Sequence, residues 1–341
     1  MKNIATIGGG TGSFTLLSGL KKYPINISAI VSMADDGGST GKLRDELGVL
    51  PPGDIRQCLV ALSNSSDTLR ELMNYRFENG GLEGHNFGNL LLSALEKIKG
   101  GFSDGVEEAT IILGVKGKVI PVSEDDMNLC IQLNDNQILV GENQLDHNSE
   151  VRNKGIKKVY LKPKAKANLD ALEAIKKADM IVIGPGDHYG SIIPNLLVSG
   201  ISEAILKSRA KVVYNCNLTN KKGQTTGFNV DKYVDEMDDF LGGKRIDYVI
   251  FPFNKPAQEL EKKYEKREGK NSIVKISEDK KIKRDYKIVR ADVLNRTKII
   301  KNKKDKIADT RSFIRHDSDK LASVLMEILN SDDRSFIKKI V

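Results

Sequence analysis

The sequence predicts an α/β protein with a doubly wound, mostly parallel β-sheet and a small antiparallel β insertion. Short runs of β-branched residues alternate with stretches of helical periodicity along the first two-thirds of the chain. Two glycine-rich turns each follow such a run, which is typical of strand–turn–helix units. A length of 341 residues with 39% hydrophobic and 29% charged residues suits a protein with a full core.

The expected elements follow in chain order. Strands of the main sheet are expected at residues 3–7, 27–33, 180–183, 211–215 and 246–251. Helices are expected between them, at 14–22, 87–99, 168–178 and 230–241. Near the C-terminus, DSDKLASVLMEILN spaces its apolar residues for one more amphipathic helix.

The stretch 128–142 interrupts this pattern. Its sequence, NLCIQLNDNQILVGE, has two alternating β runs around Asn134-Asp135-Asn136, which predicts a hairpin. Together with runs at 118–122 and 157–161, it is expected to form a small antiparallel patch. We therefore expect one domain over residues 1–330, with this insertion at about 116–165 and a variable segment at 255–311.

Charge and cysteine usage exclude several classes of protein. The formal charge is +8, and residues 255–311 hold 20 Lys or Arg against 10 Asp or Glu. Because this segment has few aromatic residues, it predicts a solvated surface and no nucleic-acid partner. The chain has no apolar run of 18 residues and no signal-peptide pattern, so neither a membrane span nor export is expected. Three dispersed cysteines indicate a reducing, cytoplasmic location and no zinc site.

A glycine-rich loop follows the first expected strand. IATIGGGTG places Gly9, Gly10, Thr11 and Gly12 between a strand and a helix, where backbone N–H groups can reach an anion. We interpret it as a nucleotide or phosphate loop. NAD(P) remains an alternative, because Asp35 could accept a ribose hydroxyl, although the third glycine of that fingerprint is replaced by Ser13.

The stretch MADDGGSTGKLRDELGVLPPGDIRQ, residues 33–57, combines both signs of charge. Carboxylates here could accept ribose or sugar hydroxyls, or hold Mg²⁺ against a diphosphate. Glycines and hydroxyls could donate to phosphate, and arginines could balance its charge. The candidate residues are Asp35, Asp36, Gly37, Gly38, Ser39, Arg44 and Arg56.

Three further polar loops follow expected strands or precede helices. GHNFGN contributes Asn86 and Asn89, IGPGDH contributes Gly184 and Gly186, and NCNLTN contributes Asn215. Each also has a structural interpretation as a cap or turn; Asp54 and Gln57, for example, have N-cap and N3 spacing. Because ligands bind beyond the carboxyl ends of parallel strands, we expect one shared cleft.

The motifs GGGTG, ADDGGSTGKLRDE, PPGDIR, GHNFGNLL, SIIPNLLV and IRHD occur in this order and resemble the YvcK/CofD-like family. The resemblance is greatest to its bacterial gluconeogenesis factor branch, YvcK. It implies a Rossmann-like fold and a regulator that binds UDP-sugars, notably UDP-N-acetylglucosamine, and supports growth and cell shape on gluconeogenic carbon sources without established catalysis. A protein partner and homo-oligomers are compatible with this role. The CofD branch instead implies a transferase acting on a nucleotide-diphosphate-linked donor, with Mg²⁺.

The resemblance also implies roles for individual residues. Thr11 and Arg315 match positions of the UDP-sugar site, and Tyr264 matches a tyrosine that would stack on uracil, with an amphipathic-helix role as the alternative. Ser318 stands where that branch can carry a phosphorylatable threonine. The tetrapeptide 187–190, Asp-His-Tyr-Gly, departs from the usual Ser-Leu-Tyr-Thr, which indicates a different ligand group at this loop.

Overall fold

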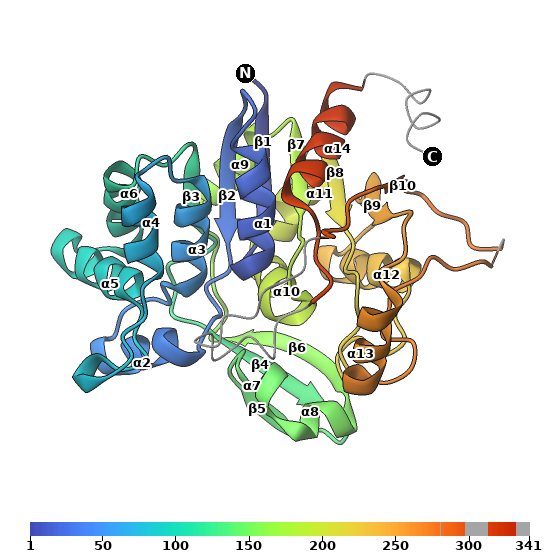
Figure 1. The fold of residues 1–341 in the computed structure, drawn as a ribbon, viewed down its shortest axis with the longest axis horizontal. Helices are drawn as coiled ribbons and strands as arrows, with labels where there is room; N and C mark the ends of the chain where they lie inside the picture. Colours follow the sequence, from blue (N-terminus) through green and yellow to red (C-terminus); the bar gives the residue numbers. More distant parts are fainter. Residues whose placement is uncertain (280, 297–312, 332–341) are drawn as a thin grey trace.

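The computed structural model describes residues 1–279, 281–296 and 313–331. A seven-stranded sheet in the order β10-β9-β8-β7-β1-β2-β3 forms its centre, with every neighbouring pair parallel (Figure 1). Its strands are β1 (Asn3–Gly8), β2 (Asn26–Val31), β3 (Lys118–Pro121), β7 (Met180–Ile183), β8 (Lys211–Asn215), β9 (Tyr248–Pro252) and β10 (Lys287–Ala291).

The strand sequences explain why this sheet is parallel and central. The four residues of β7 are all buried, and β1 is buried over its last five residues. Strands covered on both faces are typically continuous apolar runs, as in parallel sheets. The predicted strands at 180–183 and 211–215 are confirmed residue for residue, and those at 3–7, 27–33 and 246–251 are confirmed with small shifts at their ends.

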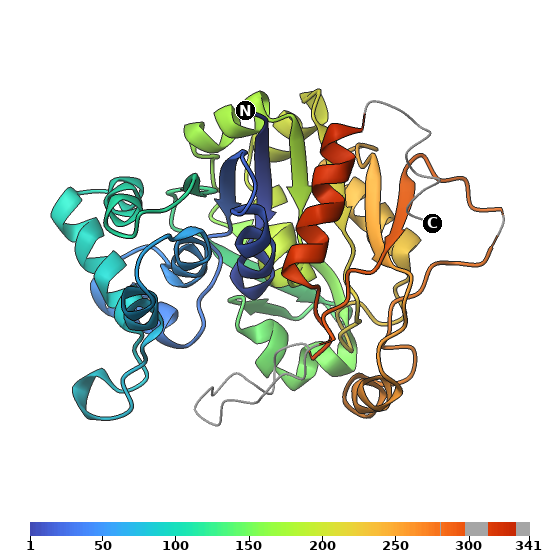
Figure 2. The same ribbon diagram turned by 45° about the horizontal axis from the view of Figure 1, so that its top comes forward.

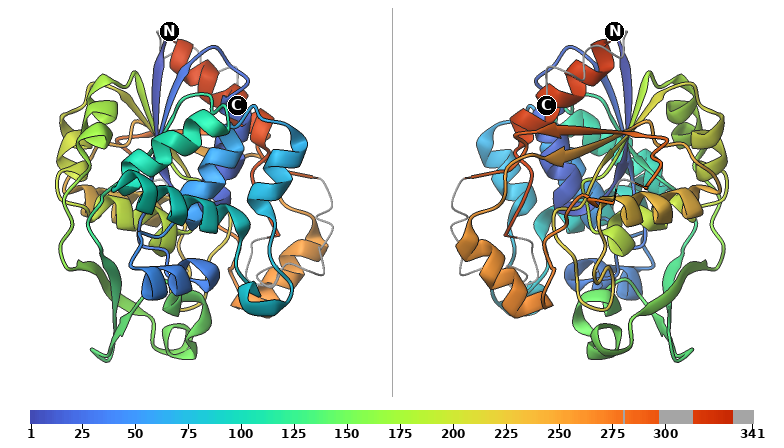
Figure 3. Two further views of the ribbon diagram at one scale, coloured as in Figure 1. Left: turned by 90° about the vertical axis from the view of Figure 1, so that its left-hand side faces the viewer. Right: turned by 90° about the vertical axis from the view of Figure 1, so that its right-hand side faces the viewer.

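Helices cover both faces of the sheet (Figures 2 and 3). One face carries α1 (Gly10–Leu20), α3 (Gly53–Leu62) and α14 (Ser318–Asn330), and α14 packs beside α1 although they lie at opposite ends of the sequence. The other face carries α9 (Leu169–Lys177), α11 (Ile201–Lys207) and α12 (Val230–Leu241). The predicted helices at 87–99 and 230–241 are confirmed without change.

Four more helices pack together beyond the β3 edge of the sheet: α2 (Gly38–Leu47), α4 (Asp67–Asn74), α5 (Phe87–Lys99) and α6 (Phe102–Ile112). The start of α2 was not expected, because the glycines of GGSTG favour a loop. Short helical segments complete the described part of the chain: η1 (Gly80–Leu82), α7 (Gln144–His147), α8 (Ser149–Lys154), η2 (His188–Ile192), α10 (Ile193–Leu196) and α13 (Gln258–Glu268).

The antiparallel insertion is a three-stranded sheet in the order β5-β4-β6. It comprises β4 (Asn128–Leu133), β5 (Ile138–Val140) and β6 (Ile156–Lys162), and the predicted hairpin turn is confirmed, with Asn136 at φ 69°. This small sheet, with α7 and α8, lies beyond the carboxyl ends of the main strands (Figure 1). It is therefore placed to close the end of the sheet where ligands bind.

One expectation was wrong. The run at 118–122 does not join the antiparallel patch: β3 pairs in parallel with β2, Ser28 opposite Lys118, since a short run of this kind carries no information about which strand it pairs with. The described part of the Lys-rich segment 255–311 contains α13 and β10, and its interpretation as a solvated, variable surface stays a prediction; residues 280 and 297–311 of it lie outside the described residues. None of the helices in the described ranges is long and apolar enough to cross a membrane.

Candidate functional site

The main sheet has a switch point between β1 and β7. The chain adds strands outward on one side of β1 as β2 and β3, and on the other side as β7 to β10. Loops that follow neighbouring strands at such a point leave on opposite faces and open a crevice between them. A pocket of about 300 Å³ lies there.

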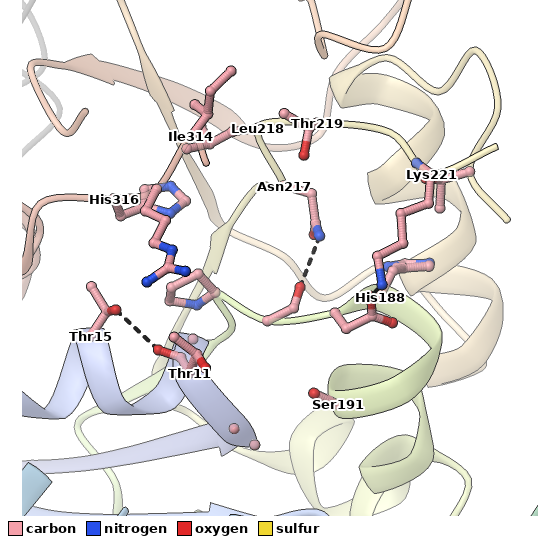
Figure 4. Close-up of a pocket in the computed structure, with 18 of the residues that line it drawn as sticks. Thr11, Thr15, His188, Ser191, Asn217, Leu218, Thr219, Lys221, Ile314 and His316 are labelled. Atoms are coloured by element: carbon pink, nitrogen blue, oxygen red, sulfur yellow. Dashed lines mark hydrogen bonds and ion pairs between the residues drawn. The ribbon is translucent and has the colours of Figure 1, made fainter. Parts of the chain in front are cut away.

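Seven parts of the chain line this pocket (Figure 4). They are the turn after β1 with the start of α1, α3, α7, the turn after β7, the loop after β8, α12, and the segment before α14. The lining residues are Gly9, Gly10, Thr11, Gly12, Thr15, Gln57, Asp146, Pro185, Gly186, Asp187, His188, Ser191, Asn217, Leu218, Thr219, Lys221, Gln224, Thr225, Tyr233, Ile314, Arg315 and His316.

Gly12 allows the two glycine loops to approach each other. A Cβ atom built on Gly12 would lie 2.0 Å from the carbonyl oxygen of Pro185 and 2.7 Å from Cα of Gly186. Both neighbours are backbone atoms, so no side-chain rotation could relieve the contact. The closeness of these loops, and therefore the shape of the pocket, depends on glycine at this position.

The side chain of Asp54 accounts for the glycine at position 9. The spacing of Asp54 to Gln57 allowed a structural interpretation as the cap of α3, but Pro52 is the N-cap residue, and Asp54 lies in the first helical turn. Its carboxylate instead packs against the glycine loop: a Cβ on Gly9 would lie 2.2 Å from Oδ2 of Asp54. Burial, followed by the charge of Asp35, raises the pKa of Asp54 to about 8, although Arg56 and a hydrogen bond from the backbone N–H of Gly10 oppose the shift.

The wall that carries Arg315 is held by strand-like pairing. The backbone N–H of Asn295 donates to the carbonyl of Arg315 at 2.9 Å, and that of Asp317 donates to the carbonyl of Val293 at 2.7 Å. This pairing fixes the segment before α14 beside the pocket. Arg315, which the sequence connects with this site only through the family resemblance, therefore lines the same pocket as the glycine loop.

Tyr264 lies behind this wall and outside the pocket lining. Its side chain is 1% exposed, and its hydroxyl accepts a hydrogen bond from the backbone N–H of Phe313 at 2.5 Å. Lys263 and Arg267, on the same helix, lie over the rings of Phe313 and Tyr264. Tyr264 therefore supports the segment that carries Arg315.

The loop after β8 forms the opposite wall. Nδ2 of Asn217 donates to the carbonyl of Gly186 at 2.8 Å and ties the loop to the turn after β7. Lys221 pairs with Asp187 at 2.5 Å and with Asp146 at 2.6 Å. The side chain of Gln224 donates to the carbonyl of Leu145 at 2.8 Å, so α7 is anchored to the same loop.

Other predicted residues gather in a separate, buried polar cluster. Nε of Arg56 donates to Oδ1 of Asn89 at 2.9 Å, and the backbone N–H of Asn86 donates to Oγ of Ser39 at 3.2 Å. Asn86 also caps α5 by accepting from the backbone N–H of Asn89. This cluster joins three of the sequence motifs behind the glycine loop and does not line the pocket. Gly37 and Gly38 lie next to it, at the start of α2.

Asp35 and Asp36 face different partners. Asp35 accepts from the backbone N–H of Gly37 at 3.0 Å, whereas Asp36 accepts from that of Asn143 at 2.7 Å. Burial is the main cause of the raised pKa of Asp35, and burial with the charges of Asp35 and Asp187 raises that of Glu142 well above its usual value. In the part of the chain that the structure describes, no group of three or more metal-ligating side chains is placed to hold a metal ion.

The remaining candidates lie at or beyond the edge of the site. Nδ2 of Asn215 donates to the carbonyl of Gly184 at 2.9 Å, beneath the turn after β7. Arg44 lies away from the pocket, where it donates to the carbonyl of Met127 at 2.9 Å. Ser318 is the first residue of α14, just after the N-cap Asp317.

Fold and site together define a doubly wound α/β protein with a polar pocket at the switch point of its sheet. A family profile described as 2-phospho-L-lactate transferase CofD matches residues 4–294. A gluconeogenesis factor from Bacillus subtilis is 38% identical over 328 residues, covering 96% of this chain and 98% of the relative. The gluconeogenesis factor of Halalkalibacterium halodurans is 44% identical over 275 residues, covering 80% and 84%.

A crystal structure of a member of the UPF0052 family from Bacillus halodurans superposes with a TM-score of 0.86 at 39% identity, covering 96% of this chain and all of that one. The chain therefore belongs to the CofD/UPF0052 family.

Several pocket residues were not predicted from the sequence. Lys221 and Gln224 follow a predicted strand in a loop that contains a glycine, so the motif was recognised but the roles of these two polar residues were not. Asp146 comes from the insertion, and nothing in the sequence connects it with the loop after β8.

Proposed function

We propose that this protein is a regulator that binds a UDP-sugar, with UDP-N-acetylglucosamine as the first candidate, and supports growth and cell shape on gluconeogenic carbon sources. The observation that carries this proposal is the pocket at the switch point, where the glycine loop and Arg315 line the same cavity. The names of the relatives from Bacillus subtilis and Halalkalibacterium halodurans support the regulatory part.

The chemistry of the pocket suits a nucleotide-linked diphosphate. Backbone N–H groups after β1 and the start of α1 favour an anion, and the guanidinium of Arg315 can pair with phosphate oxygens. Hydroxyls of Thr11 and Thr15 line the same side. Polar side chains on the opposite wall can accept hydrogen bonds from the hydroxyl groups of a sugar.

Isothermal titration with UDP-N-acetylglucosamine tests binding. We expect saturable heat with the intact chain and an affinity lowered at least about tenfold by Arg315→Ala, because one charge-assisted contact to phosphate contributes roughly 1.5–3 kcal/mol. Arg290→Ala, on an exposed part of β10, is the matched control. An absence of heat and of thermal stabilisation at millimolar ligand would refute the proposal.

Complementation tests the regulatory role. The chain should restore growth on a gluconeogenic carbon source to Bacillus subtilis that lacks its own gluconeogenesis factor, and Arg315→Ala should not. In the same strain Ser318→Ala tests the hydroxyl at the start of α14. If the Arg315→Ala variant also restored growth, the growth-supporting role would not depend on ligand binding through Arg315.

A transferase is the second candidate. The family profile carries the name of a transferase, and burial raises the pKa values of Asp35, Asp54 and Glu142. Of these three carboxyl groups, that of Asp54 packs against the glycine loop. Asp35 and Asp36 would be the candidates to meet a Mg²⁺ ion that arrives with a diphosphate. Metal-dependent turnover of a nucleotide-linked donor, lost in Asp36→Asn, would favour this candidate over a binding regulator.

A further inference from the structure

We infer that the end of the pocket around Lys221 takes the neutral, hydroxyl-bearing end of the ligand and rejects a sugar that carries a carboxylate. This inference rests on the proposed function and adds the orientation of the ligand and its substrate class. It concerns the ion-paired cluster of Lys221, Asp187 and Asp146, here called the Lys221 triad.

The pocket has two chemically different ends. Figure 4 shows Thr11, Thr15 and His316 at one side, and Lys221, His188 and Ser191 at the other. The first side contains the glycine loop and the segment with Arg315, so anion-binding groups are concentrated there. The second side contains the Lys221 triad.

The Lys221 triad carries a net negative charge. Nζ of Lys221 lies 2.5 Å from Asp187 and 2.6 Å from Asp146, so one ammonium group faces two carboxylates. Although burial acts in the opposite direction, Lys221 and a hydrogen bond from the N–H of Gly190 hold the pKa of Asp187 below its usual value, and the two carboxylates raise the pKa of Lys221. The ammonium group is therefore already neutralised and cannot serve as a second phosphate site.

The triad remains open to a ligand. The side chains of Lys221, Asp187 and Asp146 keep exposed fractions of 28%, 23% and 31%. Carboxylate oxygens that are partly exposed in a pocket can still accept hydrogen bonds from hydroxyl or amide groups. The same oxygens repel another carboxylate, because like charges at contact distance in a partly desolvated site are strongly unfavourable.

His188 supplies a second observation at this end. It is 3% exposed and lines the pocket, and neither of its ring nitrogens has a hydrogen-bond partner among the described residues. Burial lowers the pKa of His188 to about 4, so the ring is neutral at pH 7. Among the described residues that line this end of the pocket, Lys221 is the cation, and it is already paired with two carboxylates. This end therefore offers no uncompensated positive charge to a ligand carboxylate.

Titration of the intact chain with UDP-glucose and UDP-glucuronic acid tests the inference, because the two ligands differ only in a hydroxymethyl group against a carboxylate. We expect the wild-type protein to bind UDP-glucuronic acid at least about tenfold more weakly. Asp187→Asn makes the triad neutral and should reduce the difference in affinity between UDP-glucose and UDP-glucuronic acid. Asp146→Asn, which alters a more exposed residue, should reduce this ratio of affinities as well. Asp285→Asn, from an exposed pair with Lys244, is the control and should leave the ratio unchanged.

The outcomes separate this inference from the proposed function. Equal affinity for the two ligands in the wild-type protein would overturn the inference while leaving UDP-sugar binding intact. A ratio unchanged in both Asp187→Asn and Asp146→Asn would also overturn it. Failure of both UDP-glucose and UDP-N-acetylglucosamine to bind would refute the proposed function and this inference with it.

Discussion

Replacing Gly12 by alanine should lower both stability and ligand affinity. Because Gly12 is in α1, the change would stabilise an unobstructed helix by up to about 1 kcal/mol. The new Cβ atom, however, would lie 2.0 Å from the carbonyl oxygen of Pro185. Favourable contacts between heavy atoms require roughly 3.5 Å, so the turn after β7 must move by about 1 Å or more. Overpacking of this kind costs about 1–3 kcal/mol, and the clash therefore outweighs the gain in helix propensity.

Thermal denaturation and titration check this prediction together. We expect the midpoint to fall by a few degrees, about 2–4 °C for each kcal/mol lost, and UDP-N-acetylglucosamine to bind more weakly because both displaced loops line the pocket. Gly81→Ala is the control, since no atom lies within 4 Å of its added Cβ. A midpoint for Gly12→Ala at or above that of the wild type, with unchanged affinity, would refute the reasoning about the close approach.

Two further predictions concern groups behind the pocket. The pKa of Asp54 is about 8 in the folded protein and near 4 when unfolded, so at this group the folded state binds more protons between these values. The contribution of Asp54 to the free energy of unfolding therefore falls as pH rises from 4 to 8. Urea denaturation across this range should show a more positive slope of stability against pH for Asp54→Asn than for the wild type, and equal slopes would contradict the assignment. Tyr264→Phe should weaken ligand binding several-fold although residue 264 does not line the pocket, because the change leaves the backbone N–H of Phe313 without this acceptor. Tyr75→Phe, at an exposed position, is the control. Equal affinity of the two variants for the ligand would exclude a positioning role for Tyr264.

The sequence predicts those parts of the fold whose cause is local. The strands at 180–183 and 211–215 contain consecutive β-branched residues, and the hairpin has turn residues at its centre, so their positions could be found without a structure. The glycine loop could likewise be placed between a strand and a helix. Arg315 could be assigned to the same site only through the resemblance of the IRHD motif to the family, because no local pattern connects residue 315 with the glycine loop.

The parts that could not be predicted depend on contacts between distant segments. The strand β3 has no feature that distinguishes a parallel from an antiparallel neighbour. The pairing of Lys221 with Asp146 joins residues 75 positions apart and requires the insertion to fold over the end of the main sheet. The role of Asp54 was missed because the reason for Gly9 lies in the side chain packed against it, which one sequence alone does not reveal.

The route of the chain around the pocket has a consequence for protein synthesis. The glycine loop at residues 9–12 leaves the ribosome early, but the wall with Arg315 and His316 is made more than 300 residues later. Since the N-terminal part of a chain emerges first, the strands around the switch point can pair before the pocket has its last wall. The complete pocket therefore does not exist until the segment before α14 has been made. A chain that binds a ligand in the complete pocket is one in which α1 and α14 have already packed together.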